Sequence, residues 1–136
     1  DQKRYNKYLT WANSFFQDSL LIEQIVLLDV PDSNHIGLPL GCHLEQIAVQ
    51  KLPIIQKDKR YIISKSLWNR LGQNGKAGLV LHEIIYREAL ELGQSNSMRA
   101  RIFTAHIASN IFSEISATKY WEIAESLFPS RSPGAR

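Results

Sequence analysis

The sequence is poor in cysteine and lacks the long apolar runs and repeats that mark several protein classes. Its 136 residues include one cysteine, Cys42, so an internal disulfide is excluded. No stretch approaches the roughly 18 consecutive apolar residues of a membrane-spanning helix. There is no internal repeat and no low-complexity segment, and no glycine spacing matches a phosphate-binding loop. These absences argue against a disulfide scaffold, a membrane span, a repeat protein and a P-loop protein.

Charge of one sign is also scarce, because 16 Lys and Arg residues face 13 Asp and Glu residues, for a net charge of +3. The basic residues are scattered rather than interleaved with aromatic residues in a stripe, so a nucleic-acid partner is not expected. Hydrophobic residues make up 44% and charged residues 21% of the chain, an ordinary globular composition. We predict a single domain over residues 1–129 and a flexible tail over 130–136.

The first half of the chain predicts one helix followed by strands. Apolar residues at helical spacing predict an amphipathic helix over 4–18, with its aromatic residues in the core. Segments rich in β-branched or alternating apolar residues predict strands, the last two paired as a hairpin, over 22–30, 43–50 and 60–65. A helix that continues through Leu28 is the alternative for the first strand. Proline and glycine predict a loop over 31–42, and residues 56–59 form a polar turn.

The second half predicts helices. The first helix is predicted over 67–71 with Ser66 as its cap, and the second over 76–92 with Gly93 as its end. The third is predicted to start at a cap of Ser95, Asn96 or Ser97 and to end at about Ser113. The fourth is predicted to start at Thr118 and to end at Phe128. Trp68, Trp121 and Phe128 are expected in the core. The fold class is therefore α+β, with a small antiparallel sheet packed against a helical layer. The helix over 76–92 is expected to be the most buried element.

A His-Glu pair interrupts the apolar run of that central helix. Leu81, Ile84, Ile85 and Ala89 predict burial on nearly all sides of the helix. A buried His82 and a buried Glu83 need partners, because an unpaired charge in a dry interior is costly. They therefore belong either to a structural polar network or to a functional site. The residues that we assign to such a network are Glu83, Arg87, Glu88, Arg99 and Arg101.

The order of strand 60–65, short helix and His-Glu helix resembles the core of the zincin metallopeptidases. In that family two histidines in His-Glu-x-x-His bind zinc and the glutamate is the general base. The resemblance makes His82 the first metal ligand and Glu83 the catalytic base, and Tyr86 stands in place of the second histidine. His106 has the chain spacing of the third ligand in the thermolysin-like branch. A phenol is a poor zinc ligand, so we expect no cofactor, although the resemblance would imply zinc.

The sequence also resembles an uncharacterised group of bacterial proteins that are predicted to be secreted or periplasmic and that carry a His-Glu-x-x-Tyr motif. The resembling segments are Gly41-Cys42, 45–48, Leu67-Trp68, 81–88 and Asn96-Ser97. This resemblance implies a periplasmic or secreted location. Because the chain begins at Asp1 without Met, we expect a processed form or a fragment. Cys42, otherwise a small buried hydrophobe, would then pair with a cysteine in an upstream segment of the same protein.

Two functions remain open at the level of the sequence. The first is a non-catalytic binding or structural module with a degenerate zincin-like core, whose partner is a protein or a cell-envelope component. The alternative is a peptidase-like, metal-dependent hydrolase that uses Glu83 as its general base. A complete ligand set around His82, to which His35 or His43 could contribute, would favour the hydrolase. So would a free sheet edge near residues 60–65, where an extended substrate could bind.

Overall fold

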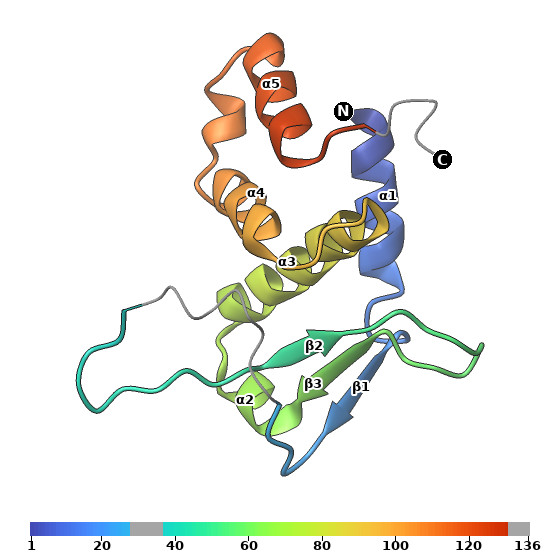
Figure 1. The fold of residues 1–136 in the computed structure, drawn as a ribbon, viewed down its shortest axis with the longest axis vertical. Helices are drawn as coiled ribbons and strands as arrows, with labels where there is room; N and C mark the ends of the chain where they lie inside the picture. Colours follow the sequence, from blue (N-terminus) through green and yellow to red (C-terminus); the bar gives the residue numbers. More distant parts are fainter. Residues whose placement is uncertain (28–36, 131–136) are drawn as a thin grey trace. The chain divides into compact units, whose positions relative to one another are not determined.

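The computed structural model describes residues 1–27 and 37–130, and it confirms the α+β class (Figure 1). Helices account for 51% of the structure, and a three-stranded sheet accompanies them. The chain divides into two compact units, Asp1–Val80 and Leu81–Arg136, which we describe in turn. The single domain over 1–129 stays a prediction, and residues 131–136 of the expected tail lie outside the described residues.

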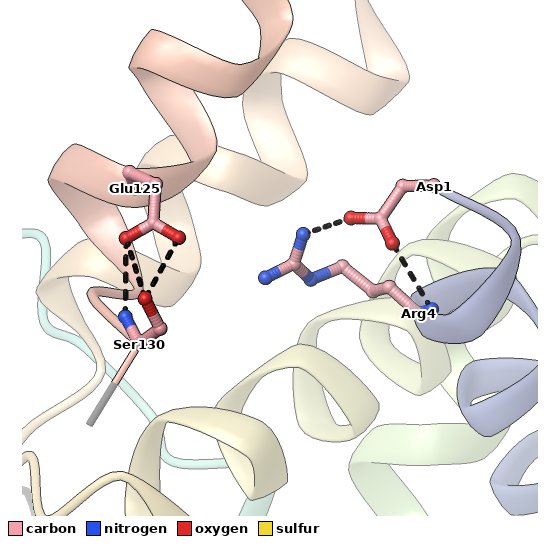
Figure 2. Close-up of polar contacts among 4 residues, drawn as sticks. All are labelled: Asp1, Arg4, Glu125 and Ser130. Carbon is pink, nitrogen blue, oxygen red and sulfur yellow. Dashed lines mark hydrogen bonds and ion pairs between the residues drawn. The ribbon is translucent and has the colours of Figure 1, made fainter. Parts of the chain in front are cut away.

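The first unit opens with helix α1, Gln2–Asn13. Asp1 caps it by accepting a hydrogen bond from the Arg4 N–H at 3.2 Å, and the Arg4 guanidinium binds the other carboxylate oxygen of Asp1 (Figure 2). The helix is as predicted, but it ends at Asn13 rather than at residue 18. No residue of α1 itself is buried, so the expected core of aromatic residues is wrong in part. Phe15 is fully buried, whereas Tyr5 and Phe16 are each 60% exposed.

The sheet is mixed rather than wholly antiparallel, which corrects the prediction. Its strands are β1 (Ser19–Ile22), β2 (Ala48–Gln50) and β3 (Tyr61–Ser64), in the order β1-β3-β2. β2 and β3 pair antiparallel, so the predicted hairpin is confirmed, although β2 begins at Ala48 rather than at residue 43. β1 pairs with β3 in parallel. Parallel pairing needs a crossover of a dozen or more residues, and the long segment between these two strands supplies it.

The first predicted strand, 22–30, is wrong in its position. β1 begins earlier, at Ser19, and ends at Ile22. Gln24 has φ +53°, a left-handed conformation through which an extended strand cannot continue. Leu27 makes an isolated antiparallel bridge to Gln46. Residues 28–36, which include the alternative helical end at Leu28, lie outside the described residues.

The core of the first unit forms around the start of β3. Tyr61 and Phe15 are both fully buried, with ring centroids 4.5 Å apart. Ile63 is buried in the same strand. Helix α2, Lys65–Arg70, follows β3 directly and buries Trp68, as expected. Its N-cap position is Ser64 rather than Ser66, because the helix begins before the predicted cap.

Helix α3, Gln73–Glu91, starts earlier than predicted and includes Gly75. Its end is as predicted. Gly93 has φ +87°, and its N–H donates to the Leu90 carbonyl at 3.0 Å. Glycine takes this left-handed conformation without a clash between Cβ and the backbone, so it ends the helix. The helix runs without interruption through the boundary between the two units.

In the second unit, helix α4 spans Met98–Ala108, followed by the short helix η2 (Ile111–Ser113) and by α5 (Ala117–Leu127). Ser97, one of the three predicted caps, is the N-cap of α4. α4 ends before the predicted Ser113, and Asn110 beyond it is left-handed at φ +61°. The cap of α5 is Ser116 rather than Thr118, because the Ser116 hydroxyl accepts from the Lys119 N–H at 3.1 Å.

An aromatic cluster occupies the core of the second unit. The Phe103 ring lies 5.2 Å from those of Phe112 and Phe128, and the Phe112 ring lies 5.0 Å from that of Tyr120. Phe128 is buried as expected, but Trp121 is 46% exposed, so its assignment to the core is wrong. Near the end of α5, Glu125 accepts hydrogen bonds from the backbone N–H and the hydroxyl of Ser130, which ties Ser130 to the helix (Figure 2). None of the helices in the described residues is both long and apolar enough to cross a membrane.

Candidate functional site

The apolar residues of the His-Glu segment are withdrawn from solvent largely as predicted. Ile85 and Ala89 are fully buried and Ile84 is 2% exposed. Leu81 is half-buried rather than buried. These residues and the His-Glu pair belong to one continuous helix, in which Glu83 is buried and His82 is half-buried.

Glu83 is buried, which confirms one part of its predicted role. Its exposed fraction is 5%, and that of Glu88 on the same helix is 3%. The guanidinium Nε of Arg87 lies 3.8 Å from a carboxylate oxygen of Glu91, one turn further along. The predicted pairing of Glu83 with Arg87, Arg99 or Arg101 stays a prediction. Arg87 is the best placed by burial, since its side chain is 18% exposed.

His82 and Tyr86 lie side by side on α3. Their ring centroids are 6.2 Å apart and their planes are inclined by 31°, as expected for residues one helical turn apart. The imidazole of His82 thus has a phenol beside it at the position where a zincin has its second histidine. A neutral phenol does not supply the donor that such a zinc site uses, so these two residues do not fit a zincin-type centre.

His106 contacts residues of α4 and η2. Its Nδ1 lies 2.7 Å from the carbonyl oxygen of Ile102, and its ring stacks on Phe112 with centroids 5.5 Å apart. If Nδ1 donates this bond, Nε2 is left as the acceptor of the neutral ring. Within residues 1–27 and 37–130, no group of three or more His, Cys, Asp or Glu side chains is placed to hold a metal ion. A metal site at His82, Tyr86 and His106 stays a prediction.

The other candidates lie in the first unit or outside the described residues. His43 is exposed, and its Nε2 lies 3.6 Å from a carboxylate oxygen of Glu45. His35 lies outside the described residues. Cys42 is exposed, so the expectation of a small buried hydrophobe is wrong. Its N–H donates to the Pro39 carbonyl at 3.1 Å in a turn, and the disulfide to an upstream segment stays a prediction.

The sheet edge proposed for a substrate is not an edge. β3, which covers 61–64, is the central strand, with β1 on one side and β2 on the other. Its hydrogen-bonding groups are therefore already used by its neighbours. An extended peptide cannot add to the sheet at this strand, so the condition of a free edge near 60–65, which would have favoured the hydrolase, is not met.

A different feature, which the sequence reasoning did not single out, is the loop that joins β2 to β3. We call residues 51–58 the hairpin tip. Its large apolar side chains are strongly exposed: Leu52 by 75%, Ile54 by 90% and Ile55 by 61%. In Figure 1 this loop extends from the ends of β2 and β3 away from the sheet. The signal in the sequence is a run of four apolar residues, 52–55, just after Lys51.

Asp58 organises the backbone of the hairpin tip. Its Oδ2 accepts from the Ile54 N–H at 2.9 Å and from the Ile55 N–H at 3.2 Å. Its own N–H donates to the Ile55 carbonyl at 3.0 Å. The hydrogen bonds from Ile54 and Ile55 to the ionised carboxylate hold the pKa of Asp58 below its usual value, and nearby Lys51 adds to this effect. The tip therefore holds a defined conformation.

Comparison with known proteins identifies no relative that could indicate a function. No protein family matches the chain, and no curated protein or solved structure matches it significantly. The functional argument consequently rests on the residues and their geometry.

Proposed function

We propose that this chain is a non-catalytic binding module of the bacterial periplasm or of the secreted fraction, and that it contacts its partner through the hairpin tip. The observation that carries the proposal is the exposure of Leu52, Ile54 and Ile55 on a loop held by Asp58. Exposed apolar side chains that lie close together are typical of interaction sites. A loop already fixed in conformation loses less entropy when it binds.

The environment of Glu83 supports a non-catalytic role. A general base must come within hydrogen-bonding distance of the water that it activates. Glu83 is 5% exposed, and its neighbour His82 lies against the Tyr86 ring. The central position of β3 also leaves no edge at that strand for an extended substrate. A structural role for the polar residues of α3 accounts for the burial of Glu83 and for the contact between His82 and Tyr86.

The alternative function is a metal-dependent hydrolase with Glu83 as general base. One observation favours it: the Nδ1 contact of His106 with the Ile102 carbonyl. Metal-ligating histidines commonly make such a bond with one ring nitrogen and bind the metal with the other. Because Tyr86 does not complete a zincin ligand set, we assign no catalytic step to this arrangement.

Metal analysis and peptide hydrolysis distinguish the two functions. Protein purified without a histidine tag is incubated with zinc, passed through a desalting column and assayed for bound metal and for cleavage of a peptide library. We expect neither stoichiometric zinc nor cleavage that Glu83→Gln abolishes. One equivalent of zinc that is lost in both His82→Ala and His106→Ala, together with cleavage that Glu83→Gln removes, would overturn the proposal.

The binding role has its own test. We expect the purified protein to sediment with isolated bacterial cell envelopes, and the double variant Ile54→Ser/Ile55→Ser to lose this association while it keeps its thermal melt. Leu40→Ser is the matched control, because Leu40 is an equally exposed apolar residue on another loop of the same unit. Equal retention of both variants and of the unmodified protein would refute a binding role for the hairpin tip.

A further inference from the structure

We propose that the partner of the hairpin tip is a lipid bilayer surface that contains anionic phospholipid, into which Leu52, Ile54 and Ile55 insert. This inference rests on the proposed binding function and specifies its partner. The juxtaposition that carries it lies within the hairpin tip, where the exposed lysines Lys51 and Lys57 flank the exposed apolar residues Leu52, Ile54 and Ile55 in the chain.

Two backbone N–H groups of the tip are already hydrogen-bonded, which lowers the cost of moving them out of water. Peptide groups that enter the apolar part of a bilayer must already be hydrogen-bonded, because each unsatisfied group is costly there. Ile54 and Ile55 supply two of the three apolar side chains of the tip. Their backbone N–H groups both donate to the Asp58 carboxylate. The side chains of these two residues can therefore reach the outer acyl region, while the charged Asp58 carboxylate stays at the polar interface and keeps their N–H groups paired.

The charged residues of the tip are two exposed lysines and the Asp58 carboxylate, which accepts hydrogen bonds from backbone N–H groups. Ile54 and Ile55 are at the middle of the loop, and Lys51 and Lys57 flank them in the chain. Lys59, closer to the sheet, is held by the Gln17 carbonyl at 2.6 Å. Apolar side chains match the acyl region, and ammonium groups match the anionic phosphates just outside it. Because the one carboxylate of the tip is paired with backbone N–H groups while both lysines are exposed, the tip favours an anionic bilayer over a purely apolar protein groove.

Insertion of a single small tip predicts weak and reversible binding. A few apolar side chains and two lysines contribute far less than a membrane-spanning helix, so the protein is expected to bind on the surface and to exchange. Attraction between exposed charges is screened by salt. Binding should consequently fall as ionic strength rises, and it should be weak on bilayers without anionic lipid.

Vesicle sedimentation tests the proposal with defined lipids. We expect the protein to bind vesicles of phosphatidylglycerol mixed with phosphatidylcholine more tightly than vesicles of phosphatidylcholine alone. Ile54→Ser/Ile55→Ser should weaken binding at least about tenfold, as expected from two lost apolar side chains. Lys51→Gln/Lys57→Gln should weaken it by about fivefold per lysine. Leu40→Ser should bind as the unmodified protein does. No preference for the anionic vesicles, or equal weakening in Leu40→Ser, would overturn the proposal.

A fluorescent label reports whether the tip itself enters the bilayer. Because Cys42 is the single cysteine, a Cys42→Ser background allows one polarity-sensitive dye to be placed at Ile54→Cys or, as the control, at Leu40→Cys. We expect the emission to shift to shorter wavelength on anionic vesicles for the dye at position 54 alone. No shift there, or equal shifts at both positions, would contradict insertion.

Protease treatment of the envelopes separates failure of this proposal from failure of the binding function. Binding that survives removal of envelope proteins supports a lipid partner. Binding that depends on those proteins overturns the lipid proposal and leaves the binding module in place. If the protein associates with neither treated nor untreated envelopes, both the lipid proposal and the binding function are overturned.

Discussion

At the scale of single residues, the degree of burial separates the side chains that stabilise the fold from those that are free to contact a ligand. Ile85 is fully buried, whereas Ile54 on the hairpin tip is 90% exposed. The two residues have the same chemistry and opposite environments. The first removes apolar surface from water on folding, and the second can do so only on binding a partner.

Ile85→Ala should therefore lower the free energy of unfolding by about 2–5 kcal/mol, because it removes buried methyl groups and leaves a cavity. Ile54→Ala, the matched control, should change it by less than about 0.5 kcal/mol. Urea denaturation followed by circular dichroism measures both. Similar small changes in the two variants would mean that α3 is not part of the core.

The buried carboxylate of Glu83 leads to a second prediction at this scale. We expect Arg87 to be its partner, since Arg87 is mostly buried and one turn away, whereas Arg99 is exposed. Arg87→Ala should lower the free energy of unfolding by about 3–5 kcal/mol, because it strands a buried charge. Arg99→Ala should have an effect below about 1 kcal/mol. Thermal melts compare the stability of the two variants. If Arg99→Ala lowers stability more than Arg87→Ala, the partner of Glu83 is Arg99. If neither substitution lowers stability, the ion pair is absent.

At the scale of elements, the two ends of α3 show how strongly local chemistry decides where a helix runs. The helix accepts Gly75 and Gly78 inside its first turns, and it stops at the left-handed Gly93. A glycine inside a helix weakens it through its greater freedom in the unfolded chain. A glycine at a left-handed end does the opposite, because other residues are strained there.

Three glycine-to-alanine substitutions in and after α3 should thus differ in sign. At Gly78 an added Cβ meets nothing within 4 Å, so Gly78→Ala should raise the free energy of unfolding by about 0.5–1 kcal/mol. At Gly75 the Cβ would lie 3.3 Å from the Leu71 side chain, so the gain should be smaller. Gly93→Ala should lower it by about 1–2 kcal/mol. A stabilising Gly93→Ala in chemical denaturation would show that the left-handed end is wrong.

The loop of the β2–β3 hairpin supplies a pH-dependent prediction. The Ile54 and Ile55 N–H groups lower the pKa of Asp58 in the folded state. A carboxyl with a lowered folded pKa stabilises the loop above its unfolded pKa of about 3.9, and this contribution is lost as the pH falls through the lower, folded value. The amide resonances of Ile54 and Ile55 should therefore titrate with a midpoint below about pH 3.9. Asp58→Asn should abolish the titration; a midpoint above that value would contradict the hydrogen bonds.

At the scale of the whole molecule, the chain forms two compact units joined within one helix. The boundary between Val80 and Leu81 falls inside α3, which covers Gln73–Glu91. Each unit has its own core, with Ile63 buried in the first and Phe103 in the second. Because breaking a helix in its middle loses hydrogen bonds on both sides, we expect the two units to unfold together.

Hydrogen exchange can test this cooperativity. Ile63→Ala and Phe103→Ala should each cost about 2–5 kcal/mol and should each accelerate exchange of slowly exchanging amides in both units. The exposed-site variant Ile54→Ala controls for effects unrelated to the core. Acceleration confined to the unit that carries the substitution would show two independently unfolding units rather than the single domain predicted over 1–129.

The presence of the helices was largely determined by the sequence itself, whereas most of their ends and caps lie at other residues than predicted. The α+β class, the end of α3 at Gly93 and the burial of Ile84, Ile85 and Glu83 all depend on patterns within a few residues. Such patterns are readable because hydrogen bonds and side-chain contacts in a helix join residues three or four positions apart. The β2–β3 hairpin belongs to the same class, since its strands are close in the chain.

Only the tertiary structure decided the features that join distant residues. The parallel pairing of β1 with β3, and hence the central place of β3, depends on where a long crossover returns the chain. The exposure of Trp121 and Cys42 depends on what packs against them, which no local pattern encodes. The hairpin tip shows the same limit: four apolar residues at 52–55 could belong to a buried strand or to an exposed loop. The hydrogen bonds of Asp58 and the pairing of the flanking strands place them outside the core, because the chain turns before those side chains can be covered.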